Sequence, residues 1–276
     1  MNLRLRKIYN GLKKFISDFV DGDFFGLSAE ISFYLLSSFF PMIIMVFTAG
    51  SAISLNYTDT MFKVLAMLPK KVEVLLINML LSHGESTAVI AITATLSIST
   101  MSGLILAVGK GLNRFYKLKN NRSMIMSNFM AVIFAVMIFI SIIASVGLII
   151  FGQVIATAIS MHVTRPEVLK LWNISRYILI FVFIAFVISA LYKAFPTIKL
   201  KIRQVLPGAL FTTVAWYVAS MLFAVYVNNF PQYEIIYGSL AGFVCMIMWI
   251  YIIAVIILAG AKINALLYRR KNDKQS

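Results

Sequence analysis

The chain is poor in the residues that build most catalytic and metal sites. Its 276 residues include only 10 Asp and Glu, two His and one Cys. The single Cys245 has no partner for a disulfide and no second thiol for a metal site. The acids are scattered, and His83 and His162 fall in different loops. Metal-assisted phosphodiester cleavage needs clustered carboxylates or histidines, so the sequence argues against a nuclease and predicts no catalytic residue, metal or cofactor.

Apolar residues, in contrast, make up 61% of the chain, and the mean hydropathy is +0.91. A soluble domain of this length would leave much of that apolar surface in contact with water. The sequence therefore predicts an all-α, polytopic membrane protein. It shows no nucleotide-binding loop and no energy-coupling domain, so a carrier of this kind would work on a gradient or by facilitation.

The longest apolar segment runs from Tyr237 to Asn264 and has no charged side chain before Lys262. At ~1.5 Å per residue, one helix over this segment would cross a hydrocarbon core of ~30 Å. Small residues cluster at both of its ends, and small residues let helices approach closely in lipid. This favours a packed inner helix, around which the rest of the chain is organised, over a lipid-facing anchor.

Six apolar segments predict six transmembrane spans in a single membrane domain over residues 1–276. The spans are predicted at 33–55, 88–108, 129–152, 177–194, 206–227 and 237–261, followed by a basic tail over 262–276. Pro41 falls inside the first span, where it is expected to kink the helix, and Pro207 suits the first turn of the fifth.

Two further segments have helical periodicity but are too polar to cross the membrane. Residues 1–22 combine apolar and basic positions, which is typical of an amphipathic helix on an anionic membrane surface. The alternative for this segment is a solvated charged tail. Residues 56–87 predict short extracytoplasmic helices between spans one and two.

The distribution of basic residues predicts the orientation. Only six of the 25 Lys and Arg fall in the first, third and fifth loops, namely Lys63, Lys70, Lys71, Arg165, Lys170 and Arg176. The other 19 lie in the two termini and in the second and fourth loops. The positive-inside rule places those segments, and both termini, in the cytoplasm, and it accounts for the net charge of +15 without a nucleic-acid partner.

Two features of the first two spans suggest functional residues. Glu30 lies at or just inside the predicted membrane boundary, where it is either functional or a solvated interfacial carboxylate. The second span carries six hydroxyl side chains in ten residues, with Thr93, Ser97 and Thr100 on one face. These hydroxyls either bond within and between helices or line a polar cavity.

Several motifs resemble the YihY/BrkB family of bacterial inner-membrane proteins, once labelled ribonuclease BN. The matching stretches are Ala29–Tyr34 with Phe40-Pro41, Gly103, Asn113–Tyr116, Tyr192 and Pro196, Leu206–Ala209, Trp216, Phe230 and Tyr233, Tyr237–Gly242, Trp249 and Gly260-Ala261. The family pattern near the end resembles Gly-Ala-Glu-x-Asn, whereas this chain has Lys262 in place of the acid, followed by Asn264. Lys262 is interpreted as snorkelling to the cytoplasmic interface.

The resemblance implies an envelope membrane protein of the bacterial cytoplasmic membrane that acts as a transporter or flippase. With the polar and broken helices, it favours transport of an anionic substrate, small or lipid-like. A non-transporting scaffold is the alternative, and a ribonuclease is the third hypothesis. The expected partners are membrane lipids and the anionic substrate. The candidate substrate-binding residues are Glu30, Thr93, Ser97, Thr100, Asn113, Arg114, Arg176, Tyr237, Lys262 and Asn264.

Overall fold

The computed structural model describes residues 23–52, 87–119, 122–141, 166–229 and 241–272, and every regular element within them is a helix. This confirms the all-α prediction for that part of the chain. The helices are α2 (Phe24–Ala52), α5 (Thr87–Phe115), the helix Met124–Ser141, α7 (Pro166–Ala194), α8 (Ile202–Asn229) and α10 (Ala241–Asn272).

Several predictions fall on residues outside these ranges. They include the interfacial helix of residues 1–22, the short helices of residues 56–87, and Tyr237. These remain predictions.

Five described helices are long and apolar enough to cross a membrane. The candidate segments are Phe24–Ile43, Ala91–Phe115, Met124–Ser141, Ile202–Val227 and Ala241–Asn272. The predicted span at 177–194 corresponds to a shorter apolar helical segment, Ile178–Ala194, within α7. A multi-pass membrane protein follows from these helices, and the count of six spans stays a prediction.

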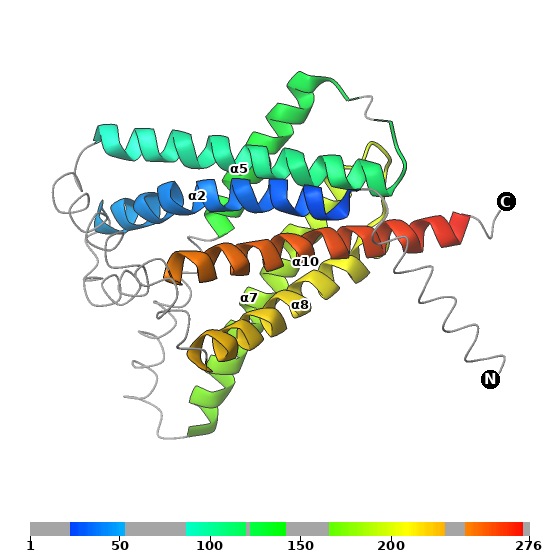
Figure 1. The fold of residues 1–276 in the computed structure, drawn as a ribbon. Helices are drawn as coiled ribbons and strands as arrows, with labels where there is room; N and C mark the ends of the chain where they lie inside the picture. The colour runs from blue at the N-terminus through cyan, green and yellow to red at the C-terminus, as the bar shows by residue number, and fades with distance from the viewer. Residues whose placement is uncertain (1–22, 53–86, 120–121, 142–165, 230–240, 273–276) are drawn as a thin grey trace.

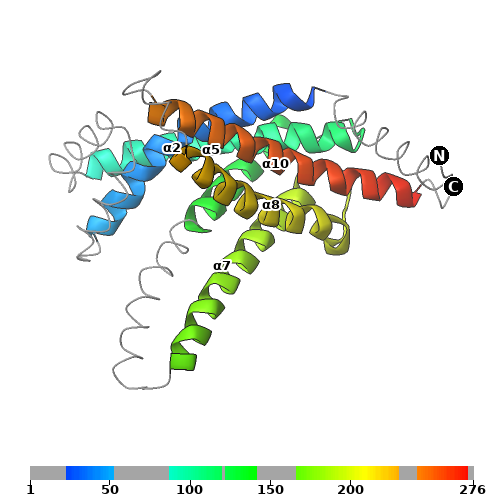
Figure 2. The ribbon, with the colours of Figure 1, turned by 60° about the horizontal axis from the view of Figure 1, so that its bottom comes forward.

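Helix α10 lies at the centre of the described helices (Figure 1). It packs against α8 on one side and against α2 and α5 on the other, while α7 packs on α8. Figure 2 shows α7 projecting away from the group formed by α2, α5 and α10. The prediction that the last apolar segment forms a packed inner helix is confirmed for the residues of α10.

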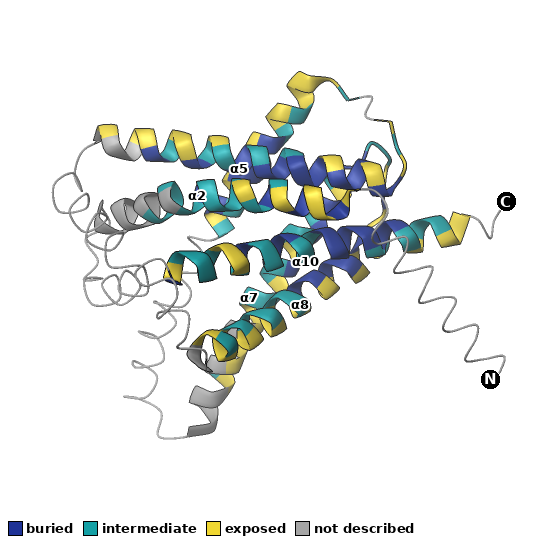
Figure 3. Ribbon diagram, in the orientation of Figure 1, coloured by how far each residue is buried: buried dark blue, intermediate teal, exposed yellow. Residues whose placement is uncertain are grey.

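The buried core lies toward one end of this assembly (Figure 3). It is formed by the start of α2, the last half of α5 and the second half of α10, with Ile31, Leu112 and Leu258 fully buried. The helix Met124–Ser141, the end of α7 and the start of α8 also contribute residues to this core. The outward faces of α8 and of the helix Met124–Ser141 expose large apolar side chains instead. Lipid chains can cover such faces, which explains how the chain accommodates so many apolar residues.

Polar contacts define where the helices begin. The carbonyl of Asp23, just before α2, accepts a hydrogen bond from the Leu27 amide at 2.9 Å. Before α8, the amide of Lys201 donates to the Gln204 side chain at 2.7 Å, which is one half of a capping box. Helix α8 therefore begins at Ile202, and Pro207 lies inside it rather than in its first turn as predicted. Helix α2 likewise continues through Pro41.

Helix α5 ends in a Schellman motif around Lys117. The Lys117 amide donates to the Arg114 carbonyl at 3.0 Å, and the Leu118 amide donates to the Asn113 carbonyl at 2.9 Å. Lys117 occupies the position where glycine is favoured, with a φ of 57°. A side chain in this left-handed conformation costs energy that glycine avoids.

We therefore expect Lys117→Gly to stabilise the protein by about 1 kcal/mol, because it removes the steric cost of the left-handed backbone. Thermal unfolding of the purified protein in detergent measures this effect. Lys117→Ala is the matched control, since it removes the same charge but keeps a Cβ atom. Equal stabilisation by both variants would assign the effect to the charge.

Candidate functional site

Helix α10 carries two buried polar residues on opposite faces. Lys262 and Asn264 are two residues apart, which places them roughly 200° apart around the helix. Asn264 meets α8, whereas Lys262 meets the start of α2 and the end of α5. Where Lys262 and Asn264 lie, the centre of the assembly is therefore polar, although α10 is apolar for most of its length.

Asn264 binds the backbone of α8 and is fully buried. Its side-chain oxygen accepts a hydrogen bond from the Gly208 amide at 2.7 Å, and its side-chain nitrogen donates to the Val205 carbonyl at 2.8 Å. These two bonds bracket Pro207, which has no amide proton to donate and disturbs the helical bonding around it. Asn264 thus supplies a donor and an acceptor to the α8 backbone on both sides of Pro207.

Two glycines allow α8 and α10 to approach closely beside Asn264. A Cβ atom on Gly208 would overlap the Gly260 carbonyl, and one on Gly260 would overlap the Thr212 hydroxyl. Tyr192 of α7 closes this contact, because its buried hydroxyl lies 2.9 Å from the Thr212 hydroxyl and donates to the Ile257 carbonyl. Three helices therefore share one small, fully buried hydrogen-bond network.

Lys262 is buried between aromatic rings. Lys262 is only 4% exposed. Its Nζ atom lies 5.6 Å from the centroid of the Phe24 ring and 5.2 Å from the centroid of the Phe115 ring. The two rings are stacked, with centroids 6.1 Å apart. The snorkelling interpretation of Lys262 is wrong, because α2 and α5 cover the side chain and their rings offer a cation–π environment.

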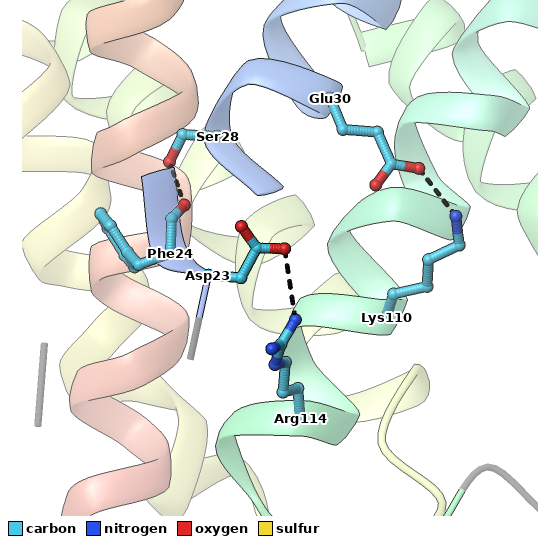
Figure 4. A network of polar contacts seen from close by, with 6 residues as sticks. All are labelled: Asp23, Phe24, Ser28, Glu30, Lys110 and Arg114. Carbon is cyan, nitrogen blue, oxygen red and sulfur yellow. Dashed lines mark hydrogen bonds and ion pairs between the residues drawn. The ribbon is translucent and has the colours of Figure 1, made fainter. Parts of the chain in front are cut away.

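Two ion pairs link α2 and α5 outside this aromatic pair (Figure 4). Lys110 Nζ lies 2.7 Å from a Glu30 carboxylate oxygen, and Arg114 Nη1 lies 3.4 Å from an Asp23 oxygen. All four side chains are partly or largely exposed, and exposed pairs contribute little stability. Two predicted site residues, Glu30 and Arg114, thus each have an opposite charge beside them.

The hydroxyl-rich segment of α5 bonds mainly to its own helix. Ser97 donates to the Thr93 carbonyl at 2.7 Å, and Thr100 donates to the Leu96 carbonyl at 2.8 Å. Thr95 and Ser102 make the same type of bond four residues back. Thr93 and Ser97 are buried, and these contacts favour the intrahelical explanation over a polar cavity wall.

Asn113 holds the linker between α7 and α8. Its side-chain oxygen accepts a hydrogen bond from the Thr197 amide at 3.1 Å. Nearby, both terminal nitrogens of Arg122 donate to the Ala194 carbonyl at 3.3 Å, which satisfies the end of α7. Asn113 is therefore a structural residue. The side chain of Arg176 lies outside the described part of the structure, as does Tyr237.

The structure brings together only part of the predicted set, and it adds residues that were not chosen. Asn113, Arg114, Lys262 and Asn264 lie at the same end of the assembly, whereas Thr93 lies toward the other end of α5. The network around Asn264 also uses Tyr192, Gly208, Thr212 and Gly260. The family motifs contained Tyr192, Gly208 and Gly260, but this signal did not show that they meet.

A buried phenol lies just beyond the end of α5. The Tyr116 hydroxyl has no hydrogen-bond partner among the described residues, and its ring packs edge-on against Tyr268 at 5.6 Å. Burial raises the pKa of Tyr116, so the group stays a protonated donor. The described part of the chain contains no group of three or more His, Cys, Asp and Glu that could hold a metal ion.

We expect Asn264→Leu to destabilise the protein strongly. Each buried backbone group that loses its partner costs roughly 1–3 kcal/mol, and the variant removes the partner of both Gly208 and Val205. Asn272→Leu, at the exposed end of the same helix, is the matched control. Thermal unfolding compares the two, and a loss of similar size in both would show that the network on α8 contributes little.

Comparisons with known proteins agree with the geometry of a helical membrane protein. The family model "Virulence factor BrkB" matches residues 15–276. "Putative ribonuclease-like protein YfkH" of Bacillus subtilis (strain 168) is 29% identical over 247 residues, which cover 88% of this chain and 90% of that protein. A "UPF0761 membrane protein" of Glaesserella parasuis serovar 5 (strain SH0165) is 29% identical over 199 residues, 69% of this chain and 65% of its own length. No solved structure matches. Because the family model covers nearly the whole sequence, this chain belongs to the BrkB family of membrane proteins.

Proposed function

We propose that this protein is a transporter or flippase that moves an anionic, lipid-like substrate across the bacterial cytoplasmic membrane. In this proposal it spans the membrane six times, with both termini in the cytoplasm. The observation that carries the proposal is the burial of Lys262 inside the central apolar helix α10.

A buried lysine is costly, and its position suggests why it is there. Moving an ammonium group out of water costs several kcal/mol even after the protein relaxes. Ionisable groups inside membrane proteins commonly mark the path of a substrate or ion. The two rings beside Lys262 offer it a cation–π environment, and the same positive charge would attract an anionic headgroup.

The surrounding helices have the features of a substrate path rather than of a simple anchor. Helix α8 contains Pro207 and α2 contains Pro41, so two candidate spanning helices each carry a proline in their interior. Pro207 lies directly beside the buried side chain of Asn264. Prolines within spanning helices, next to buried polar groups, are features of transporter sites.

The charges of the described loops support the proposed orientation. The segment 113–119, Arg122 and the segment 194–203 lie at the same end as the last turns of α10, joined by the Asn113–Thr197 and Arg122–Ala194 contacts. All of these segments are basic. The positive-inside rule assigns such an end to the cytoplasm.

The proposal is tested by reconstituting the purified protein into vesicles that carry a fluorescent phosphatidylglycerol. We expect Lys262→Met to slow its movement between leaflets about 10- to 100-fold, because one charge-assisted contact is lost. Its thermal unfolding is measured in parallel, so that slower lipid movement is separated from loss of the fold. Lys193→Met, which removes an exposed lysine from α7, is the matched control.

Other outcomes separate the alternative functions. If the wild-type protein moves no anionic lipid, or moves it no faster than Lys262→Met does, the transport proposal fails and a scaffold is favoured. An RNA-cleavage assay on the same preparation tests the activity that the name of the Bacillus subtilis relative suggests. Cleavage that persists through purification and is lost in a point variant would support an enzyme instead.

A further inference from the structure

The linker between α7 and α8, together with the first turn of α8, presents three exposed cations. Lys199, Lys201 and Arg203 are all exposed, whereas Leu200 between them is buried. The linker therefore follows the protein surface with its apolar side chain inward and its charges outward. Such an arrangement differs from a flexible basic tail, in which the positions of the charges are not determined.

Contacts on both sides of these cations hold the linker in place. Upstream, the Thr197 amide donates to Asn113, and Phe195 is buried with its ring centroid 5.6 Å from that of Phe134. Downstream, the Lys201 amide is capped by Gln204. The Thr197 hydroxyl also contacts the carbonyl of Lys119 at 3.5 Å, which brings the neighbouring basic linker alongside.

Among the described residues, few acids are present to balance the charge of this surface. The acids in the described part of the chain are Asp23, Glu30 and Glu167. Asp23 and Glu30 are paired with cations of α5, and Glu167 lies at the opposite end of α7 from the linker. An anionic partner would therefore meet a surface on which positive charge is concentrated.

Apolar side chains continue directly from the cations along α8. Ile202 is 57% exposed, and Leu206 and Leu210 are also exposed on the same helix. Ile202 is the first residue of the candidate spanning segment Ile202–Val227, so the cations lie where that segment leaves the apolar layer. A phospholipid has the complementary order, with a charged headgroup followed by apolar chains, whereas an acidic protein or a nucleic acid does not.

We infer that the α7–α8 linker is a binding surface for anionic phospholipids, in which Lys199, Lys201 and Arg203 contact the headgroup phosphate and the exposed face of α8 contacts the acyl chains. The surface lies on the outside of the assembly, so this inference does not depend on transport. Its partner is a lipid of the surrounding leaflet rather than a transported molecule.

The test is a titration of the full-length protein, purified in a neutral detergent, with phosphatidylglycerol while its thermal unfolding is followed. The apparent affinity comes from the rise in melting temperature with lipid concentration. Each basic residue near an anionic surface contributes about fivefold in affinity. We therefore expect the triple variant K199Q/K201Q/R203Q to bind phosphatidylglycerol roughly 100-fold more weakly.

Three controls make the result specific. The variant K199R/K201R/R203K keeps all charges and should keep the wild-type affinity. Lys170→Gln, near the other end of α7, should also leave it unchanged. Phosphatidylcholine and inorganic phosphate replace the anionic lipid in parallel titrations and should stabilise the protein far less.

The inference is overturned if the triple variant binds as the wild type does, or if phosphatidylcholine stabilises equally. Equal stabilisation by inorganic phosphate would show a simple ion effect and would also overturn it. Melting curves without lipid show whether the triple variant folds. If it does not, the single variant Lys199→Gln carries the test, with an expected loss of about fivefold.

Discussion

The close contact between α8 and α10 at Gly208 and Gly260 is the constraint on which the described structure depends. Neither residue could carry a side chain without overlapping the backbone or the Thr212 hydroxyl. In a membrane, helices associate through packing and hydrogen bonds rather than through exclusion of water. This contact supplies both, because it allows Asn264 to reach the α8 backbone and Tyr192 to reach Thr212 and α10.

Once α10 is held in this way, its other face determines the surroundings of Lys262. Because α8 occupies the side of Asn264, Lys262 must project toward α2 and α5, where Phe24 and Phe115 cover it. The hydrogen-bond network on α8 and the burial of Lys262 thus both follow from the position of α10. A change in the packing of α8 on α10 would therefore alter the environment of the Lys262 charge.

The charges outside this core serve a different purpose. The ion pairs between α2 and α5 are exposed, and the linker of α7 and α8 presents its cations outward while backbone and aromatic contacts hold it. Buried charge and surface charge therefore lie within one end of the molecule but in separate environments. The first lies among apolar and aromatic side chains, whereas the second lies where a charged membrane surface would meet the protein.

The sequence by itself determined the class of the protein, because long apolar segments and a scarcity of acids leave few alternatives to a helical membrane protein. It also identified α10 as an inner helix, since small residues at both ends have little use in a helix that faces only lipid. The ends of the helices were harder to predict from the sequence. The sequence placed Pro207 in the first turn of a helix, whereas Gln204 caps the Lys201 amide and α8 begins at Ile202, so Pro207 lies inside the helix. Apolar periodicity does not report such local backbone bonds.

Only the tertiary structure decided the roles of individual polar residues. Lys262 looked like an interfacial lysine because it follows the last apolar segment, but α2 and α5 return from distant parts of the chain to bury it. Likewise, the sequence left the hydroxyls of α5 with two possible roles, bonding between or within helices or lining a polar cavity, and the structure shows their donors bonded to their own helix. A one-dimensional pattern specifies which face of a helix a residue occupies. Which neighbour covers that face depends on how distant segments pack, and here that packing follows from two glycines and one asparagine.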